Sequence, residues 1–248
     1  MKLPFAAWLA FLALISVASA KIPQSDGERV GAINNLQWRE GETLTLPVSG
    51  GTLSAPKGIR QLTGVDAQRI WAMLNGTSAP LSTEAMLHDP RTGEIVFFQK
   101  LSPGHVRLDD WGAIDLDTAL KSIAENAEAD NSMRRRSGLP GIHVVGWLEA
   151  PNLDLSTHTV RWAIEAAGEH GRSVVTSVAL IFGRNGFEKL TWAGKRTIGD
   201  RDLLKIAQSG FSFGVGSRYI DYQAGDKIAE YGVADIVAVV LGAKRPPK

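Results

Sequence analysis

Alternating hydrophobic and polar positions predict a four-stranded antiparallel meander over about residues 142–193. In its second run, Val160 and Trp162 share one apolar face between polar neighbours, which is the period of two of a strand with one buried face. The third run carries apolar side chains on both faces, among them Val178 and Ala179, so we expect a central strand covered on both sides. Trp162 is therefore expected in the core.

Turn residues divide the meander. Asn185-Gly186 separates the third and fourth runs and predicts a tight type I′ turn, because both residues tolerate positive φ angles. Residues 168–171 predict the turn before the third run. Residues 151–157 predict a longer polar connection between the first two runs.

Helical spacing predicts further elements around the meander. Apolar stripes indicate a helix over residues 63–76 and a longer one from Asp115 or Asp117 to about residue 136. Asp200 begins a shorter helix that ends at Gly210. Short strands are expected at residues 43–46, 51–54, 84–88, 94–101 and 211–213.

This order predicts an α+β fold, a mainly antiparallel sheet covered by helices. Residues 21–225 are expected to form a single domain, since no Pro/Ser-rich linker or internal repeat divides them. Residues 226–248 are expected to form an apolar helical tail, helical over 226–243 and too short to span a bilayer. Three places are open to this tail: against the domain, at a membrane interface, or on another subunit.

The amino-terminal residues predict export. Lys2, an apolar run over residues 3–17 and the sequence Ala18-Ser19-Ala20 are typical of a signal peptide, residues 1–20, cleaved between Ala20 and Lys21. The alternative is an uncleaved membrane anchor. The chain has no cysteine, so an exported form has no disulfide. The whole chain has 27 basic and 26 acidic residues, and cleavage removes one of the basic residues, Lys2. The mature chain is therefore expected to have no net charge that would attract nucleic acid.

Candidate chemistry is sparse. The five histidines have no metal-ligand spacing, and neither a serine-nucleophile elbow nor a Walker loop is present. The sequence therefore predicts no catalytic residue, no cofactor and no structural metal. An acidic cluster has two interpretations, a weak calcium site or a solvated loop that leads into a helix cap, and its spacing favours the second. It comprises Asp109, Asp110, Asp115 and Asp117.

Two groups of residues are candidates for a partner surface. One is Asp109 with Asp110, and the other is the polar-aromatic patch of Arg218, Tyr219, Asp221 and Tyr222. The patch is interpreted either as a docking surface or as a hinge packed on the sheet.

Several stretches together resemble a bacterial domain-of-unknown-function family of predicted membrane-anchored proteins, over most of the mature chain. They are residues 36–38, 146–147, 150–151, 157–158, 161–163, 218–221 and 227–232. The resemblance implies a Gram-negative envelope location, in the periplasm or on the periplasmic face of the inner membrane, and implies no activity. The arrangement is also similar to the PsbP/Mog1-type α/β/α sandwich, which is an analogy of fold alone.

We expect a non-enzymatic envelope domain that binds a partner, either an envelope protein or a membrane surface, and not nucleic acid. The alternative is a hydrolytic enzyme whose acidic residues are assembled by the fold. A concave site with convergent titratable groups would favour the enzyme. The oligomeric state is left open.

Overall fold

The computed structural model describes residues 33, 35–75, 78–136, 141–168, 173–195 and 202–242. Three predictions fall outside these ranges. They are the cleavage site between Ala20 and Lys21, the helix cap at Asp200, and the turn that follows Gly168.

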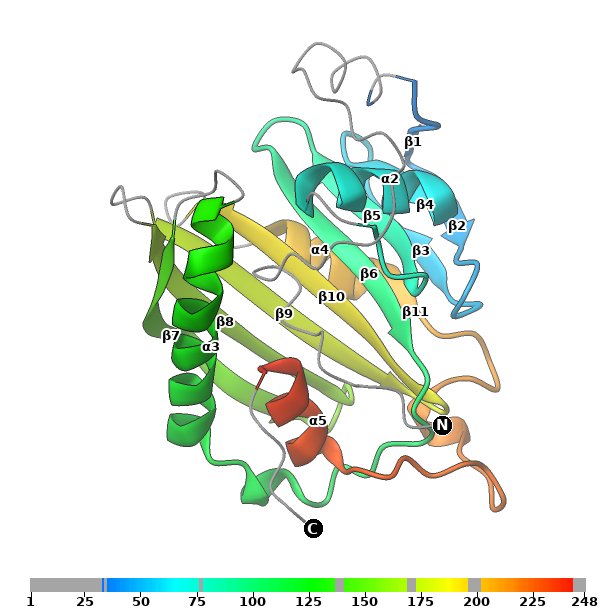
Figure 1. The fold of residues 1–248 in the computed structure, drawn as a ribbon. Coiled ribbons are helices and arrows are strands. Elements are labelled where there is room, and N and C mark those ends of the chain that lie inside the picture. The colour runs from blue at the N-terminus through cyan, green and yellow to red at the C-terminus, as the bar shows by residue number, and fades with distance from the viewer. Residues whose placement is uncertain are drawn as a thin grey trace.

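The described residues form an eight-stranded sheet in which every neighbouring pair is antiparallel (Figure 1). This sheet and the helices on it confirm the predicted α+β class. The predicted meander forms one half of the sheet. In spatial order the strands are β1 (Arg39–Glu40), β4 (Arg60–Thr63), β5 (Thr83–Asp89), β6 (Glu94–Leu101), β10 (Gly186–Lys195), β9 (Ser173–Gly183), β8 (Thr159–Gly168) and β7 (Ile142–Asp154).

A second, three-stranded sheet and four α-helices complete the described fold. The small sheet has the order β11 (Phe211–Ser212), β3 (Thr52–Ser54) and β2 (Thr43–Thr45). The helices are α2 (Gly64–Asn75), α3 (Leu116–Arg136), α4 (Asp202–Gly210) and α5 (Val233–Val240). Short 3-10 helices lie at Trp111–Ala113 and Tyr219–Asp221.

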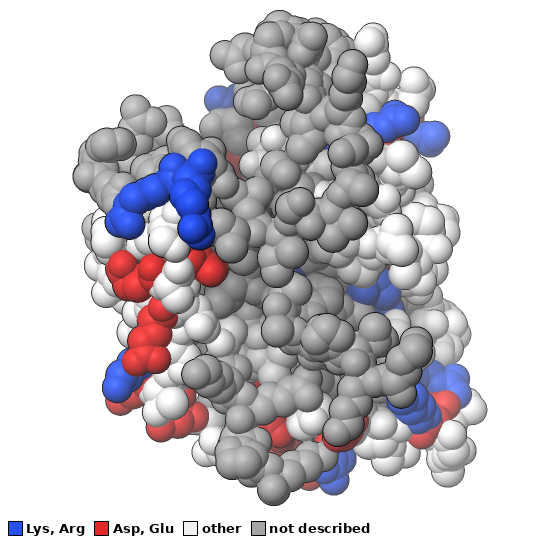
Figure 2. Space-filling model, viewed as in Figure 1, with Lys and Arg blue, Asp and Glu red and all other residues white. Residues whose placement is uncertain are grey.

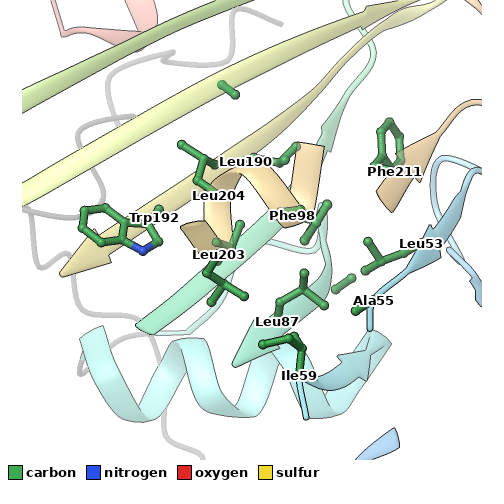
Figure 3. Packing of buried hydrophobic residues seen from close by; sticks show 14 of the residues in the cluster. Leu53, Ala55, Ile59, Leu87, Phe98, Leu190, Trp192, Leu203, Leu204 and Phe211 are labelled. Carbon is green, nitrogen blue, oxygen red and sulfur yellow. The ribbon is translucent and has the colours of Figure 1, made fainter. Parts of the chain in front are cut away.

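One face of the large sheet packs against α4 and the small sheet. Phe98 and Leu190 point from the large sheet toward Leu203 of α4 and Leu53 of β3 (Figure 3). All four side chains are buried. Burial of a large aliphatic or aromatic side chain contributes about 1.5–3 kcal/mol, so this layer is a main source of stability.

The opposite face is covered by α2 at one end and by α3 and α5 at the other (Figure 1). Trp71 of α2 packs edge-on against Phe97 of β6, with ring centroids 5.1 Å apart. Trp162 is 2% exposed and lies in the cluster that α3 and α5 cover, which confirms its prediction as core. Val178 and Ala179 fall in clusters on opposite faces, so β9 is covered on both sides as predicted.

The structure corrects three local predictions. Arg184 and Asn185 form the centre of the β9–β10 turn without positive φ, and Gly186 follows at φ +90°, which indicates a type I turn with a G1 bulge instead of type I′. Strand β7 runs on through Pro151 to Asp154, since an edge strand tolerates the missing N–H of proline. The carboxyl-terminal helix begins at Val233 and not at residue 226.

Helix α5 packs on the domain and is held at both ends. The Oδ1 atom of Asp110 accepts a hydrogen bond from the backbone N–H of Ala234, 3.3 Å away, in the first turn of the helix. Near its other end, the Nδ2 atom of Asn126 on α3 donates to the carbonyl of Gly242 at 2.7 Å. Of the three places open to the tail, the structure shows α5 against the domain, where Val237 is fully buried.

Gly232 makes this docking possible, because a β-carbon there would overlap the Asp110 carboxylate. We predict that Gly232→Ala lowers the free energy of unfolding by about 1–2 kcal/mol, through displacement of the Asp110 cap. Chemical denaturation measures this change. Gly112→Ala is the matched control, since a β-carbon at Gly112 meets no atom within 4 Å.

The double variant Asp110→Ala with Gly232→Ala separates the cap from other effects. Without the carboxylate the added methyl group fits, so we expect the pair to cost little more than Asp110→Ala alone. Strictly additive losses would show that Gly232 acts through something other than Asp110.

Candidate functional site

Four aromatic rings stack beside the start of β8, the β9–β10 turn and the chain segment that precedes α5. In order, the rings are His158, Tyr219, His105 and Tyr222. Successive ring centroids are 4.4, 4.5 and 4.3 Å apart, and successive interplanar angles are 26°, 30° and 32°. Offset stacking of this kind adds about 0.5–1.5 kcal/mol per pair beyond the burial of surface. We call these four residues the ring stack.

Backbone contacts fix both histidines of the ring stack. His158 has φ +51°, the left-handed region that non-glycine residues enter at a cost of about 1–3 kcal/mol. Its carbonyl accepts the Phe182 N–H at 2.9 Å, so the turn before β8 is tied to β9. His105 pairs with the chain on both sides, donating its N–H to the Lys227 carbonyl at 2.7 Å and accepting the Ala229 N–H at 2.8 Å.

The imidazole of His105 is buried and held in one tautomer. Its Nδ1 atom lies 3.3 Å from the Arg184 carbonyl, so Nδ1 carries the proton and donates it. Burial lowers the pKa of His105 below its ordinary value, although the hydrogen bond to the Arg184 carbonyl and the charge of Asp226 act in the opposite direction.

Two arginine–aspartate pairs fold the segment around the ring stack into a rigid loop. Arg184 binds Asp226 through two hydrogen bonds of 2.7 Å, and Arg218 binds Asp221 through bonds of 2.9 and 2.7 Å. These guanidinium groups hold the pKa of Asp226 at about 2 and the pKa of Asp221 far below its ordinary value. Bidentate pairs fix geometry as well as charge. We call residues 213–228 the carboxyl loop.

The carboxyl loop presents apolar side chains to solvent. Val215 is 90% exposed, Ile220 68% and Ile228 49%, and the Tyr222 ring at the end of the stack is 39% exposed. Single exposed apolar residues are ordinary, whereas contiguous apolar patches mark interaction sites, so the concentration of four such residues within one loop makes the loop a candidate. The carboxyl loop with its exposed ring is therefore our candidate site.

The structure brings together the predicted patch of Arg218, Tyr219 and Asp221 in one turn of 3-10 helix. Tyr219 donates its hydroxyl to the Val106 carbonyl at 2.9 Å. Burial raises the pKa of Tyr219, with a smaller contribution from Asp109, which places Asp109 beside the patch.

The predicted acidic cluster has mainly structural contacts. Asp110 caps α5. Asp115 caps α3, since its Oδ1 atom accepts the N–H groups of Asp117 and Thr118 at 3.1 and 3.0 Å. Within the described ranges, no group of three or more histidine, aspartate or glutamate side chains is arranged to hold a metal ion.

Sequence reasoning missed both histidines of the ring stack and the Arg184–Asp226 pair. His158 belongs to one of the family-like stretches, residues 157–158, but nothing in the spacing of 53 residues between His105 and His158 indicates contact. It also missed a buried acidic group formed by Glu84 and Glu188, both 0% exposed. The available signal was the position of Glu188, which shares a strand face with Leu190 and Trp192.

The geometry thus defines an α+β sandwich with a rigid surface loop. The chain belongs to the family described as "Protein of unknown function (DUF2167)", which matches residues 39–245. No curated protein matches the chain. Among solved structures, cyanobacterial PsbP (CyanoP) from Synechocystis is similar, with 13% identity and a TM-score of 0.39 over 70% of this chain and 92% of that chain. A likeness at this score carries no argument about function.

We predict that Tyr219→Phe lowers the free energy of unfolding by about 1–2 kcal/mol, because it leaves the buried Val106 carbonyl without a donor. Tyr222→Phe is the matched control, since within the described chain the Tyr222 hydroxyl has no hydrogen bond. Denaturation curves of both variants measure the difference. Equal losses in the two would contradict a specific role of the Tyr219 hydroxyl.

Proposed function

We propose that the protein is a non-enzymatic binding module of the Gram-negative envelope, and that the carboxyl loop docks into an apolar site on a protein partner. The sequence of residues 1–20 supports export and removal of this segment. The observation that carries the proposal is the exposure of Val215, Ile220 and Ile228 on a loop that two bidentate ion pairs hold in one conformation.

Rigidity is what suits this loop to binding. Ordering a flexible loop at an interface costs about 0.5–1.5 kcal/mol for each immobilised side chain, and this cost is reduced when the loop is already fixed. Arg184 contributes further bonds to Gln223 and to the Gly216 carbonyl, at 3.3 and 3.2 Å. Tyrosine, arginine and isoleucine side chains therefore stand in a fixed arrangement, and tyrosine and arginine are enriched among the residues that dominate interfaces.

Charge distribution favours a protein over an anionic membrane as the partner. The arginine of each bidentate pair, Arg184 in the β9–β10 turn and Arg218 in the carboxyl loop, is neutralised by its aspartate. Figure 2 shows basic side chains gathered at the carboxyl end of α3, and both signs side by side at the lower right of this view. Attraction to anionic lipid is typical of clusters of about 4–8 lysines and arginines. In the part of the chain described here, no helix has the length and apolarity required of a membrane span.

The enzymatic alternative has less support from the described residues. The fold brings together two acidic groups, Glu84 and Glu188. Both are 0% exposed, so neither contacts solvent in this structure. A catalytic acid or base must reach the substrate within hydrogen-bond distance, directly or through one water molecule.

Site-specific photocrosslinking in the bacterial envelope tests the docking surface. A photoreactive phenylalanine at position 220 is predicted to give a discrete protein adduct. The same residue at position 145 is the control, because Val145 is 62% exposed and lies on β7 at the end opposite to the ring stack, where Val144 pairs with Ala166. The position-220 adduct should decrease strongly when Arg184→Ala releases the loop.

Two results would contradict the proposal. Identical adducts from positions 220 and 145 would indicate non-specific collision. Adducts to lipid alone at position 220 would show that the loop contacts the membrane and not a protein.

A further inference from the structure

The pair Glu84 and Glu188 lies between the large sheet and the turn that joins β2 to β3, away from the ring stack. Glu84 occupies the irregularity in β5 between Thr83 and Ala85. Its Oε2 atom accepts two hydrogen bonds from that turn, from the backbone N–H groups of Val48 and Ser49 at 2.7 and 2.8 Å. A glutamate of the large sheet thus ties down a turn of the small one.

The second carboxyl group needs a proton. Neither oxygen of Glu188 receives an N–H or hydroxyl hydrogen bond from the described residues, and the Oε1 atom of Glu84 has no such donor either. The two carboxyl groups lie within interaction distance of each other, and a hydrogen bond between them would require a proton on one of them. Two adjacent buried carboxylates cannot both be ionised at acceptable cost.

We propose that Glu84 and Glu188 share one proton, and that this proton keeps the turn between β2 and β3 closed on the large sheet. The protonated Glu188 donates to the free oxygen of Glu84, while the other oxygen of Glu84 holds the N–H groups of Val48 and Ser49. Loss of the proton places two negative charges together, and the turn opens because it is the exposed covering layer, with Val48 52% exposed. The pair is thus a latch that is closed at low pH. This inference does not depend on the proposed binding function.

Among the residues that the structure describes, one cation faces the pair. Lys100 of β6 is the cross-strand partner of Glu188, and its Nζ atom donates to the Asn185 carbonyl at 2.7 Å and lies 5.3 Å from the centre of the Phe213 ring. From α4, buried leucines pack on this face, and Lys205 is exposed. The β2–β3 turn brings only backbone N–H groups, and the residues of β3, β9 and β11 carry no ionisable side chain.

The direction of the pH effect follows from the pKa of Glu188. Burial raises this pKa well above its ordinary value, and the neighbouring Glu84 raises it further. Between the unfolded and the folded pKa, the folded protein keeps a proton that the unfolded chain releases, so a rise in pH weakens the folded state. Below the unfolded pKa the stabilisation is complete. Burial lowers the pKa of Lys100 from 10.5 to about 8. The titration of Lys100 therefore changes the stability only between these two pH values, which lie above the range in which Glu188 is tested.

Thermal unfolding between pH 5 and pH 7.5 tests the shared proton. Glu188→Gln keeps the shape and the donor without a titrating group. We expect its melting temperature to rise above that of the wild type by about 3–5 °C for each pH unit in this range. Glu125→Gln is the control, since Glu125 is 67% exposed and makes only a 4.0 Å ion pair. A difference between Glu188→Gln and wild type that does not change with pH would overturn the shared proton.

Nuclear magnetic resonance of the wild-type protein tests the latch and does not rely on a variant that folds. The Val48 and Ser49 amide signals are expected to titrate together with one glutamate carboxyl carbon, at a midpoint well above the ordinary glutamate value of about 4.3. If every glutamate carboxyl carbon titrates near the ordinary glutamate pKa, the proposal of a shared proton is wrong. If a carboxyl carbon titrates high while both amides stay unchanged, the pair exists and the turn is not its latch.

Discussion

Backbone pairing between residues 105–107 and 227–233 is the constraint on which the candidate site and α5 both depend. His105 exchanges hydrogen bonds with the Lys227 carbonyl and the Ala229 N–H, and the Arg107 carbonyl accepts the Val233 N–H at 2.8 Å. On one side of this pairing, His105 enters the ring stack. On the other side, Val233 begins α5 beneath the Asp110 cap. One short interaction therefore fixes a surface loop and a buried helix.

The same constraint accounts for a loop that is both exposed and ordered. The carboxyl loop begins after β11 and ends where it pairs with His105, so both of its ends are anchored on packed structure. Its interior is then fixed by Arg184, which reaches from the β9–β10 turn to Asp226. Strain at His158 is accepted because stacking and the bond from Phe182 offset it. Because the loop is already ordered, binding through it would lose less conformational entropy than binding through a flexible loop.

The parts of the fold that follow local patterns could be predicted from the sequence. Strand β9 shows apolar alternation on both faces, and Asp115 stands where a helix cap is required, so the meander and α3 were predicted. Strand β1 has two residues and β4 has four, which is too few for a period of two to be seen. The predicted start of the carboxyl-terminal helix was wrong, because residues 227–229 pair with a distant segment instead of forming the first turn of the helix.

The candidate site was predictable only in part, for a physical reason. Arg218, Tyr219 and Asp221 are neighbours in the chain, so their contact is local. The contacts of Tyr219 with His105 and His158 depend on the sheet, which brings together segments that no local pattern connects. The buried Glu188 did leave a signal, because a charged residue on the apolar face of an interior strand requires a partner.

Native-state hydrogen exchange tests the central claim that the pairing makes the carboxyl loop and α5 an integral part of the domain. The amides of His105, Ala229 and Val233 are measured together with those of the β9–β10 ladder under increasing denaturant. The account predicts that all of them exchange through global unfolding, with the same free energy and the same denaturant dependence. If the amides of Ala229 and Val233 exchange through a partial opening of much lower free energy while the ladder stays protected, the segment is a separable attachment and the account is contradicted.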